Sequence, residues 1–211
     1  MGMLINGTWF NDADQTMKYG RYHRQPSKLR QLPLSQAGTD DHFDSDTLVF
    51  VASQSCPWSH AATIVHALND LAGRIPLQIA GGPRTEGYRL VSNGPLSAEN
   101  EHIHQLYSKT DPVYTGRATV PLLWDRKARQ IISNDSTAIL RFFDRIGSRT
   151  NLRPQKHEPK IDMLLVQIYD GLANAVYRAG KAQRQDEYEA AVDAVYATLQ
   201  GLEERLSCQQ F

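Results

Sequence analysis

Residues 47–60 read TLVFVASQSCPWSH, and this stretch decides the fold. Its first six residues are rich in β-branched and aromatic side chains, which is typical of a buried strand. Apolar residues then recur at helical spacing from Ala61 to Leu71. A second apolar run, Ile75 to Ala80, is predicted to form a strand because Gly81-Gly82-Pro83 ends it. The sequence therefore predicts a strand, a helix and a second strand around Cys56.

The rest of the chain extends this α/β unit and then becomes helical. Residues 84–117 are polar and interrupted by Gly and Pro, with one short helix predicted over 99–109. Two apolar runs, 120–125 and 130–133, predict a hairpin, and a helix follows residues 133–136. We expect an α/β domain over residues 47–150, an all-helical segment over 151–211 and an irregular polar lead-in over 1–46.

Composition excludes several classes of protein. The 211 residues carry 23 Lys+Arg and 23 Asp+Glu, so the formal net charge is zero. The protein therefore lacks the positive electrostatic field that nucleic-acid binding needs. No apolar run reaches the length of about 18 residues expected of a membrane span, and no secretory signal is recognisable. The two cysteines, Cys56 and Cys208, are too few for a disulfide framework or a four-ligand zinc cluster. We therefore expect a cytoplasmic protein without nucleic-acid or membrane partners.

Cys56 lies where the predicted strand passes into the predicted helix. The unpaired N–H groups and the dipole at a helix N-terminus favour a thiolate, which is the reactive form of the side chain. The alternative is a small buried hydrophobic residue, the usual environment of a free cysteine. Ser59 stands where dithiol oxidoreductases carry their second cysteine, so an outside thiol such as glutathione must resolve any mixed disulfide. The motif favours a monothiol, glutathione-linked enzyme.

Other candidate features have both structural and functional interpretations. Pro121 is either an ordinary edge-strand proline or a cis proline that presents backbone to a ligand. Asp135 and Ser136 either cap the next helix or bind a ligand's carboxylate at its N-terminus. His102 and His104 have no nearby Cys or Glu cluster in the sequence, so no metal site is predicted.

Four separated segments carry a resemblance to one family. They are residues 24–27 (RQPS), 56–60 (CPWSH), 107–124, most notably through the pattern DPxYxGRxTVPxLWD over 111–125, and 176–180 (VYRAG). With them the chain resembles the Xi-class glutathione transferases, or glutathionyl-hydroquinone reductases. The cysteine motif also resembles that of the omega class. The resemblance implies a thioredoxin-like N-terminal domain followed by an all-α domain, with glutathione as co-substrate.

The resemblance also implies a reaction and a set of site residues. Cys56 would attack a glutathionyl-hydroquinone, release the hydroquinone and carry glutathione as a mixed disulfide that a second glutathione reduces. Tyr177 matches a family tyrosine that contacts the substrate. The implied glutathione-binding residues are Tyr88 in place of a family tryptophan, Arg117, Val120, the cis proline Pro121, and Asp135 with Ser136 in place of Glu-Ser.

One departure from the family concerns length. Family members continue with more helices after the stretch resembling residues 202–206, and part of their dimer surface lies there. We therefore expect an incomplete helical domain, with a homodimer possible but less favoured, and assign Cys208 no role. Two alternative functions are kept: an omega-like dehydroascorbate reductase or thioltransferase that uses the same cysteine, and a non-catalytic glutathione-binding remnant that lacks the missing helices.

Overall fold

The structure is a computed structural model that describes residues 2–30, 32, 44–147 and 149–208. The chain divides into two compact units, one of Met1–Asp14 with Ser27–Leu152 and the other of Gln15–Pro26 with Arg153–Phe211. The expected lead-in is thus divided between the two units. Its residues 33–43 lie outside the described part of the chain.

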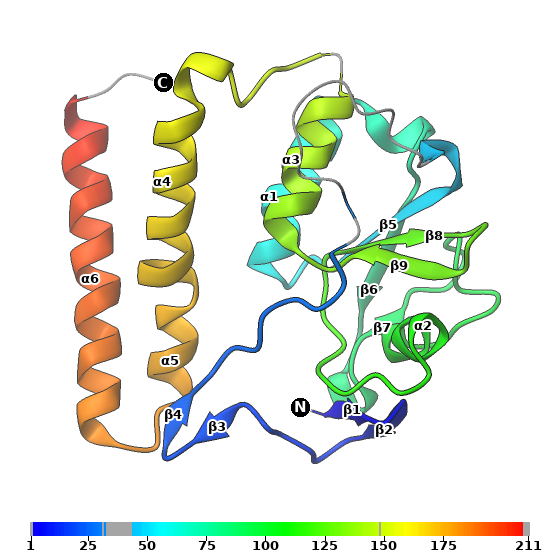
Figure 1. Cartoon of the computed structure of the whole chain (residues 1–211), viewed down its shortest axis with the longest axis horizontal. Coiled ribbons are helices and arrows are strands. Elements are labelled where there is room, and N and C mark those ends of the chain that lie inside the picture. Colours follow the sequence, from blue (N-terminus) through cyan, green and yellow to red (C-terminus); the bar gives the residue numbers. More distant parts are fainter. Residues whose placement is uncertain (1, 31, 33–43, 148, 209–211) are drawn as a thin grey trace. The chain divides into compact units, whose positions relative to one another are not determined.

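The first unit is built on a five-stranded mixed sheet with the strand order β7-β6-β5-β8-β9 (Figure 1). The strands are β5 (Leu48–Ala52), β6 (Leu77–Gly81), β7 (Arg89–Leu90), β8 (Leu122–Asp125) and β9 (Gln130–Ser133). The central strand β5 pairs in parallel with β6 and antiparallel with β8. The predicted strand-helix-strand unit and the predicted hairpin therefore meet at β5, and the expected thioredoxin-like α/β fold is confirmed.

Helices cover both faces of the sheet: α1 (Pro57–Leu68), α2 (Ile103–Thr110) and α3 (Ser136–Ile146). Successive side chains of a strand point to opposite faces. Phe50 accordingly packs in a cluster with α1 and α3. There the Phe143 ring contacts the Phe50 ring edge-on, with the ring centroids 4.9 Å apart. Val49 and Val51 pack in a second cluster with α2. All five residues of β5 are buried for this reason.

Two hairpins correct the expectation of an irregular lead-in. Strands β1 (Met3–Ile5) and β2 (Thr8–Phe10) pair across Asn6 and Gly7, whose φ values are 48° and 75°. An Asn-Gly pair between two apolar triplets is a strong signal for a two-residue hairpin, so the sequence did contain this information. A second hairpin joins β3 (Met17–Lys18) to β4 (Arg21–Tyr22).

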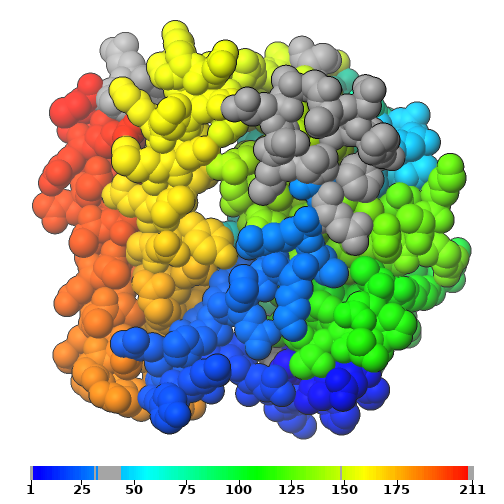
Figure 2. Space-filling view, in the orientation of Figure 1, coloured from blue at the N-terminus to red at the C-terminus, as the bar shows by residue number. Residues whose placement is uncertain are grey.

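The C-terminal part of the second unit is helical, as predicted. It contains α4 (Glu158–Ile168), the π-helical turn η5 (Tyr169–Ala173), α5 (Ala175–Lys181) and the antiparallel α6 (Gln185–Cys208), as Figure 1 shows. Gly171 allows η5 to approach α6 closely, because an added Cβ would lie 2.2 Å from the Thr198 hydroxyl oxygen. The β3–β4 segment packs against α5, and Figure 2 shows it covering the lower part of that helix.

Short 3-10 turns complete the described structure. They are η1 (Ser45–Thr47), η2 (Leu71–Gly73), η3 (Arg84–Glu86) and η4 (Gln155–His157). Within the described residues, no helix combines the length and the apolar character that crossing a membrane requires.

Candidate functional site

Cys56 is the residue that immediately precedes α1. Its backbone is extended (φ −113°, ψ 114°), and Pro57 is the first helical residue, as the sequence predicted. The Cys56 Sγ atom lies 3.5 Å from the Val120 carbonyl oxygen, to which the thiol donates. The side chain is 7% exposed and packs in the cluster on the α2 face of the sheet. The thiol therefore lies in an apolar environment at a helix N-terminus.

The segment opposite Cys56 contains a cis peptide bond between Val120 and Pro121, as the resemblance implies. Strand β8 begins only at Leu122, so the backbone of Val120 takes no part in the sheet ladder. Its carbonyl group instead faces the cysteine sulfur. Cys56, Val120 and Pro121 thus come together in the structure.

Tyr107, on α2, fixes the backbone that leads into this cis segment. Its fully buried hydroxyl group donates to the Thr119 carbonyl oxygen at 2.9 Å and accepts from the Thr119 N–H at 3.1 Å. The Asn134 side-chain amide donates to the same hydroxyl at 3.1 Å. Burial raises the pKa of Tyr107, so the group stays a neutral hydroxyl. Sequence reasoning gave Tyr107 no role, because its spacing marks it only as a core residue.

The N-terminus of α3 is the second candidate binding segment. One oxygen of Asp135 accepts from the backbone N–H groups of Thr137 and Ala138, both at 3.0 Å, and so caps the helix. The other oxygen pairs with Arg30 at 3.1 Å. Ser136 is the first helical residue, and its side chain is half-buried. Asp135 thus caps the helix and satisfies two of the backbone N–H groups at its N-terminus.

Arg84 connects Tyr88 to the loop that carries Cys56, although sequence reasoning did not single it out. Its guanidinium group lies 4.0 Å from the centre of the Tyr88 ring and donates to the Ser55 hydroxyl at 2.8 Å. A cation stacked on an aromatic face is a favourable pair. Arg84 therefore places a positive charge beside the residue that precedes Cys56.

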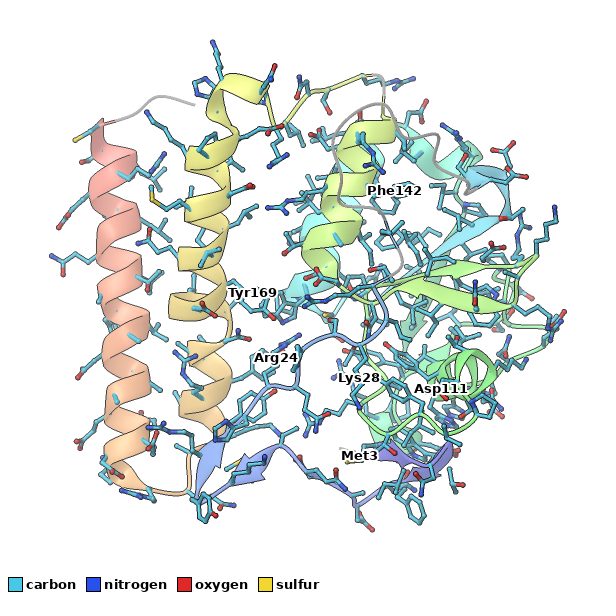
Figure 3. All side chains as sticks on the ribbon, in the orientation of Figure 1. Met3, Arg24, Lys28, Asp111, Phe142 and Tyr169 are labelled. Carbon is cyan, nitrogen blue, oxygen red and sulfur yellow. The ribbon has the colours of Figure 1, made fainter. Side chains whose placement is uncertain are left out.

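Arg117 lies in the same unit and forms an ion pair with Asp14 at 2.6 Å. Lys28 donates to the Thr115 carbonyl oxygen of the same loop at 2.7 Å. Figure 3 labels Lys28 and also Asp111, the residue directly after α2. Basic groups therefore line the loop between α2 and the cis proline.

Tyr177 belongs to the second unit, on α5. Its ring stacks on Tyr22 with centroids 6.3 Å apart and an angle of 25°. The structure thus gathers Cys56, Val120 and Pro121 in the first unit, joins them through Tyr107 to the α3 N-terminus, and places Tyr177 in the other unit.

Comparison with known proteins agrees with this geometry. Residues 55–146 match the model for the glutathione S-transferase N-terminal domain. The chain is 32% identical to glutathionyl-hydroquinone reductase PcpF from Sphingobium chlorophenolicum and 33% identical to glutathionyl-hydroquinone reductase YqjG from Escherichia coli. Both alignments cover 100% of this chain and 70% of the relative.

Similar solved structures agree with these sequence matches. The Xi-class transferase from Natrialba magadii superposes with a TM-score of 0.84 at 25% identity, over 100% of this chain and 67% of that one. The glutathione-bound structure of YqjG superposes with a TM-score of 0.71 at 33% identity, over 79% and 58% of the two chains.

A thioredoxin-like sheet with a cysteine at the first helix, a cis proline opposite it and a following helical unit is the architecture of a glutathione transferase. Within that class, the chain belongs to the glutathionyl-hydroquinone reductases, which form the Xi class.

Proposed function

We propose that the protein removes glutathione from glutathionyl-hydroquinones, with Cys56 as the nucleophile and glutathione as the co-substrate. The observation that carries this proposal is the position of Cys56 at the N-terminus of α1, with its Sγ atom facing the Val120 carbonyl oxygen beside the cis Pro121. A helix N-terminus stabilises the thiolate that attack requires.

The reaction balances in two steps. The Cys56 thiolate attacks the glutathione sulfur of the conjugate and forms a sulfur–sulfur bond, while the bond from that sulfur to the aromatic carbon breaks. The carbon takes the electron pair and a proton, which yields the free hydroquinone. A second glutathione then attacks the mixed disulfide, is itself oxidised to glutathione disulfide and releases the Cys56 thiolate.

Three segments of the first unit supply the proposed glutathione contacts. The backbone of Val120, which lies outside the sheet ladder, pairs with the cysteinyl portion of glutathione and holds its sulfur near Cys56. The carboxylate of the γ-glutamyl end binds the α3 N-terminus at Ser136, and Asp135 attracts its amino group. Tyr88, whose ring lies against the Arg84 guanidinium group, stacks against glutathione, while Arg117 contributes positive charge.

Tyr177 is proposed to donate a hydrogen bond to the hydroquinone oxygen or to the intermediate. Its hydroxyl group supplies the donor, and its ring is held by stacking on Tyr22. Replacement of Tyr177 by Phe should lower the turnover of the conjugate, because the donor is lost. It should leave formation of the Cys56–glutathione disulfide from oxidised glutathione unchanged.

The resolving thiol is proposed to come from outside the chain. Ser59, one turn after Cys56, is fully buried and is not a thiol. The second cysteine, Cys208, is exposed at the end of α6 in the other unit. A reaction that consumes reduced glutathione fits a reducing compartment such as the cytoplasm.

The test compares turnover of glutathionyl-menadiol and dehydroascorbate by the full chain. Glutathione-dependent release of menadiol in clear preference to dehydroascorbate reduction would support the proposal. Preferential reduction of dehydroascorbate would favour an omega-like reductase. Glutathione binding with neither activity, unchanged by Cys56→Ser, would identify a non-catalytic binding protein and overturn the proposal.

A further inference from the structure

Two histidines and one carboxylate come together outside the proposed glutathione site. Glu86 ends the turn η3, His102 immediately precedes α2, and His104 lies in the first turn of that helix. One potential ligand atom from each residue lies within 4.8 Å of the other two. The sequence offered only the His102-x-His104 pair, and the fold supplies the third group.

The distances approach those of a single coordination sphere. The His104 Nε2 atom lies 3.2 Å from the Glu86 Oε1 atom. Metal–ligand bonds of about 2.0–2.2 Å in tetrahedral geometry put neighbouring ligand atoms about 3.3–3.6 Å apart. Glu86 and His104 therefore already stand at the separation of two ligands of one ion. The half-buried His102 ring stacks beside the His104 ring, with centroids 5.4 Å apart and an angle of 11° between the ring planes.

The surroundings hold His104 in place. The Trp9 ring stacks on it, with centroids 4.7 Å apart and an angle of 12°, and the His104 side chain is only 11% exposed. The Gln105 side-chain oxygen accepts from the backbone N–H groups of Glu101 at 2.7 Å and His102 at 3.0 Å. This arrangement fixes the backbone from which both imidazoles project, as metal sites require of their supporting residues.

The ligand set also selects the kind of ion. Two imidazoles and one carboxylate suit Zn²⁺ and its neighbours in the first transition row, whereas Mg²⁺ and Ca²⁺ prefer oxygen ligands alone.

We propose that Glu86, His102 and His104 bind one divalent transition-metal ion, with Zn²⁺ as the representative case, and leave further positions of the ion to water. The site joins the turn η3 to the start of α2. The Ile103 N–H already donates to the Tyr88 carbonyl oxygen across the same junction at 3.0 Å. A bound ion would therefore stabilise the segment that carries Arg84 and Tyr88.

The test is calorimetric titration of the full, tag-free chain with ZnCl₂ after treatment with a chelator. The double variant Cys56→Ser, Cys208→Ser serves as background, because thiols also bind zinc. One Zn²⁺ per chain is expected, with no heat from MgCl₂. His102→Ala and Glu86→Gln should each weaken binding at least about tenfold. His157→Ala should not, because His157 is exposed in the other unit.

A second readout is thermal stability, which a ligand that binds only the folded state raises. Zn²⁺ should raise the melting temperature of the background protein and of the His157→Ala variant, but not that of Glu86→Gln. Glu86 is half exposed, so its replacement leaves the core intact. The proposal is overturned if ZnCl₂ up to about 1 mM gives no binding, or if Glu86→Gln and His102→Ala bind as tightly as the background protein.

Discussion

The hydroxyl group of Tyr107 donates to the Thr119 carbonyl oxygen at 2.9 Å, and the Thr119 N–H donates back to it at 3.1 Å. These two bonds hold the residue that precedes the Val120–Pro121 bond. The Asn134 side chain reaches the same hydroxyl group from the residue that precedes Asp135. One buried oxygen atom thus joins both segments that we propose to bind glutathione.

Replacing Tyr107 by Phe should therefore affect both stability and binding. The variant leaves the backbone groups of Thr119 and the Asn134 amide without their partner in a buried environment. We expect the free energy of unfolding to fall by about 1–3 kcal/mol and the KM for glutathione to rise. Urea denaturation and steady-state kinetics measure the two effects.

The matched control is Tyr196→Phe, because that ring is 68% exposed on α6. It should change neither quantity. If Tyr107→Phe behaved like this control, the hydroxyl group would not organise the site.

Asp135 combines a capping role with a charge, and two substitutions separate them. Asp135→Ala removes the cap on α3 and should cost about 1 kcal/mol of stability. Asp135→Asn retains an N-cap acceptor and should cost less, since the exposed pair with Arg30 contributes little. Both variants lose the charge proposed to attract the γ-glutamyl amino group, so both should raise the KM for glutathione. Equal stability of the two variants would contradict the capping role of Asp135. An unchanged KM for glutathione in both variants would contradict its binding role.

His66 should make the stability of the first unit depend on pH. It is 3% exposed, donates from Nε2 to the Ile75 carbonyl oxygen at 2.8 Å, and lies against the rings of Phe50 and Phe143. Burial lowers its pKa and outweighs the opposing effect of the hydrogen bond. The unfolded chain, with a His pKa of about 6.5, therefore binds the proton at higher pH than the folded chain does.

The direction of the pH dependence follows from this difference in pKa between the folded and the unfolded chain. The contribution of neutral His66 is complete above about pH 7 and is lost as the pH falls through 6.5 towards the lower folded pKa. Urea midpoints measured from about pH 8 to pH 5 should decrease for the wild type. The decrease should be smaller in His66→Gln, which keeps a donor for Ile75 but does not titrate. Parallel profiles of the two proteins would contradict this assignment.

The sequence predicted the elements that rest on local patterns. Strand β5 and helix α1 follow from an apolar run, a Cys-Pro junction and helical spacing, all within residues 47–71. The first hairpin was missed even though Asn6-Gly7 signals it, because residues 1–46 taken together are mostly polar and suggested an irregular segment. Strand β7 has only two residues, too few for any periodicity to be recognised.

The supporting contacts of the site could not be predicted in this way. Arg30 reaches Asp135, Arg84 reaches Ser55 and Glu86 reaches His104 only because the fold brings distant segments together. None of these pairs has a fixed spacing in the sequence. Local patterns singled out Cys56 and Pro121, and the family resemblance added a role for Val120, whereas the residues that position them required the structure.

Cys56 is proposed to carry glutathione during the reaction. Turnover of glutathionyl-menadiol should fall more than about a thousandfold in Cys56→Ser, because the nucleophile is lost, and should be unchanged in Cys208→Ser. A residual activity within tenfold of the wild type would assign the chemistry to another group.

The most direct measurement is peptide mass spectrometry of the full chain after incubation with oxidised glutathione. One glutathione adduct is expected, on the peptide that contains Cys56, which persists in Cys208→Ser and disappears on addition of reduced glutathione. Absence of an adduct at Cys56, under conditions that modify a control glutaredoxin, would show that Cys56 is not the carrier.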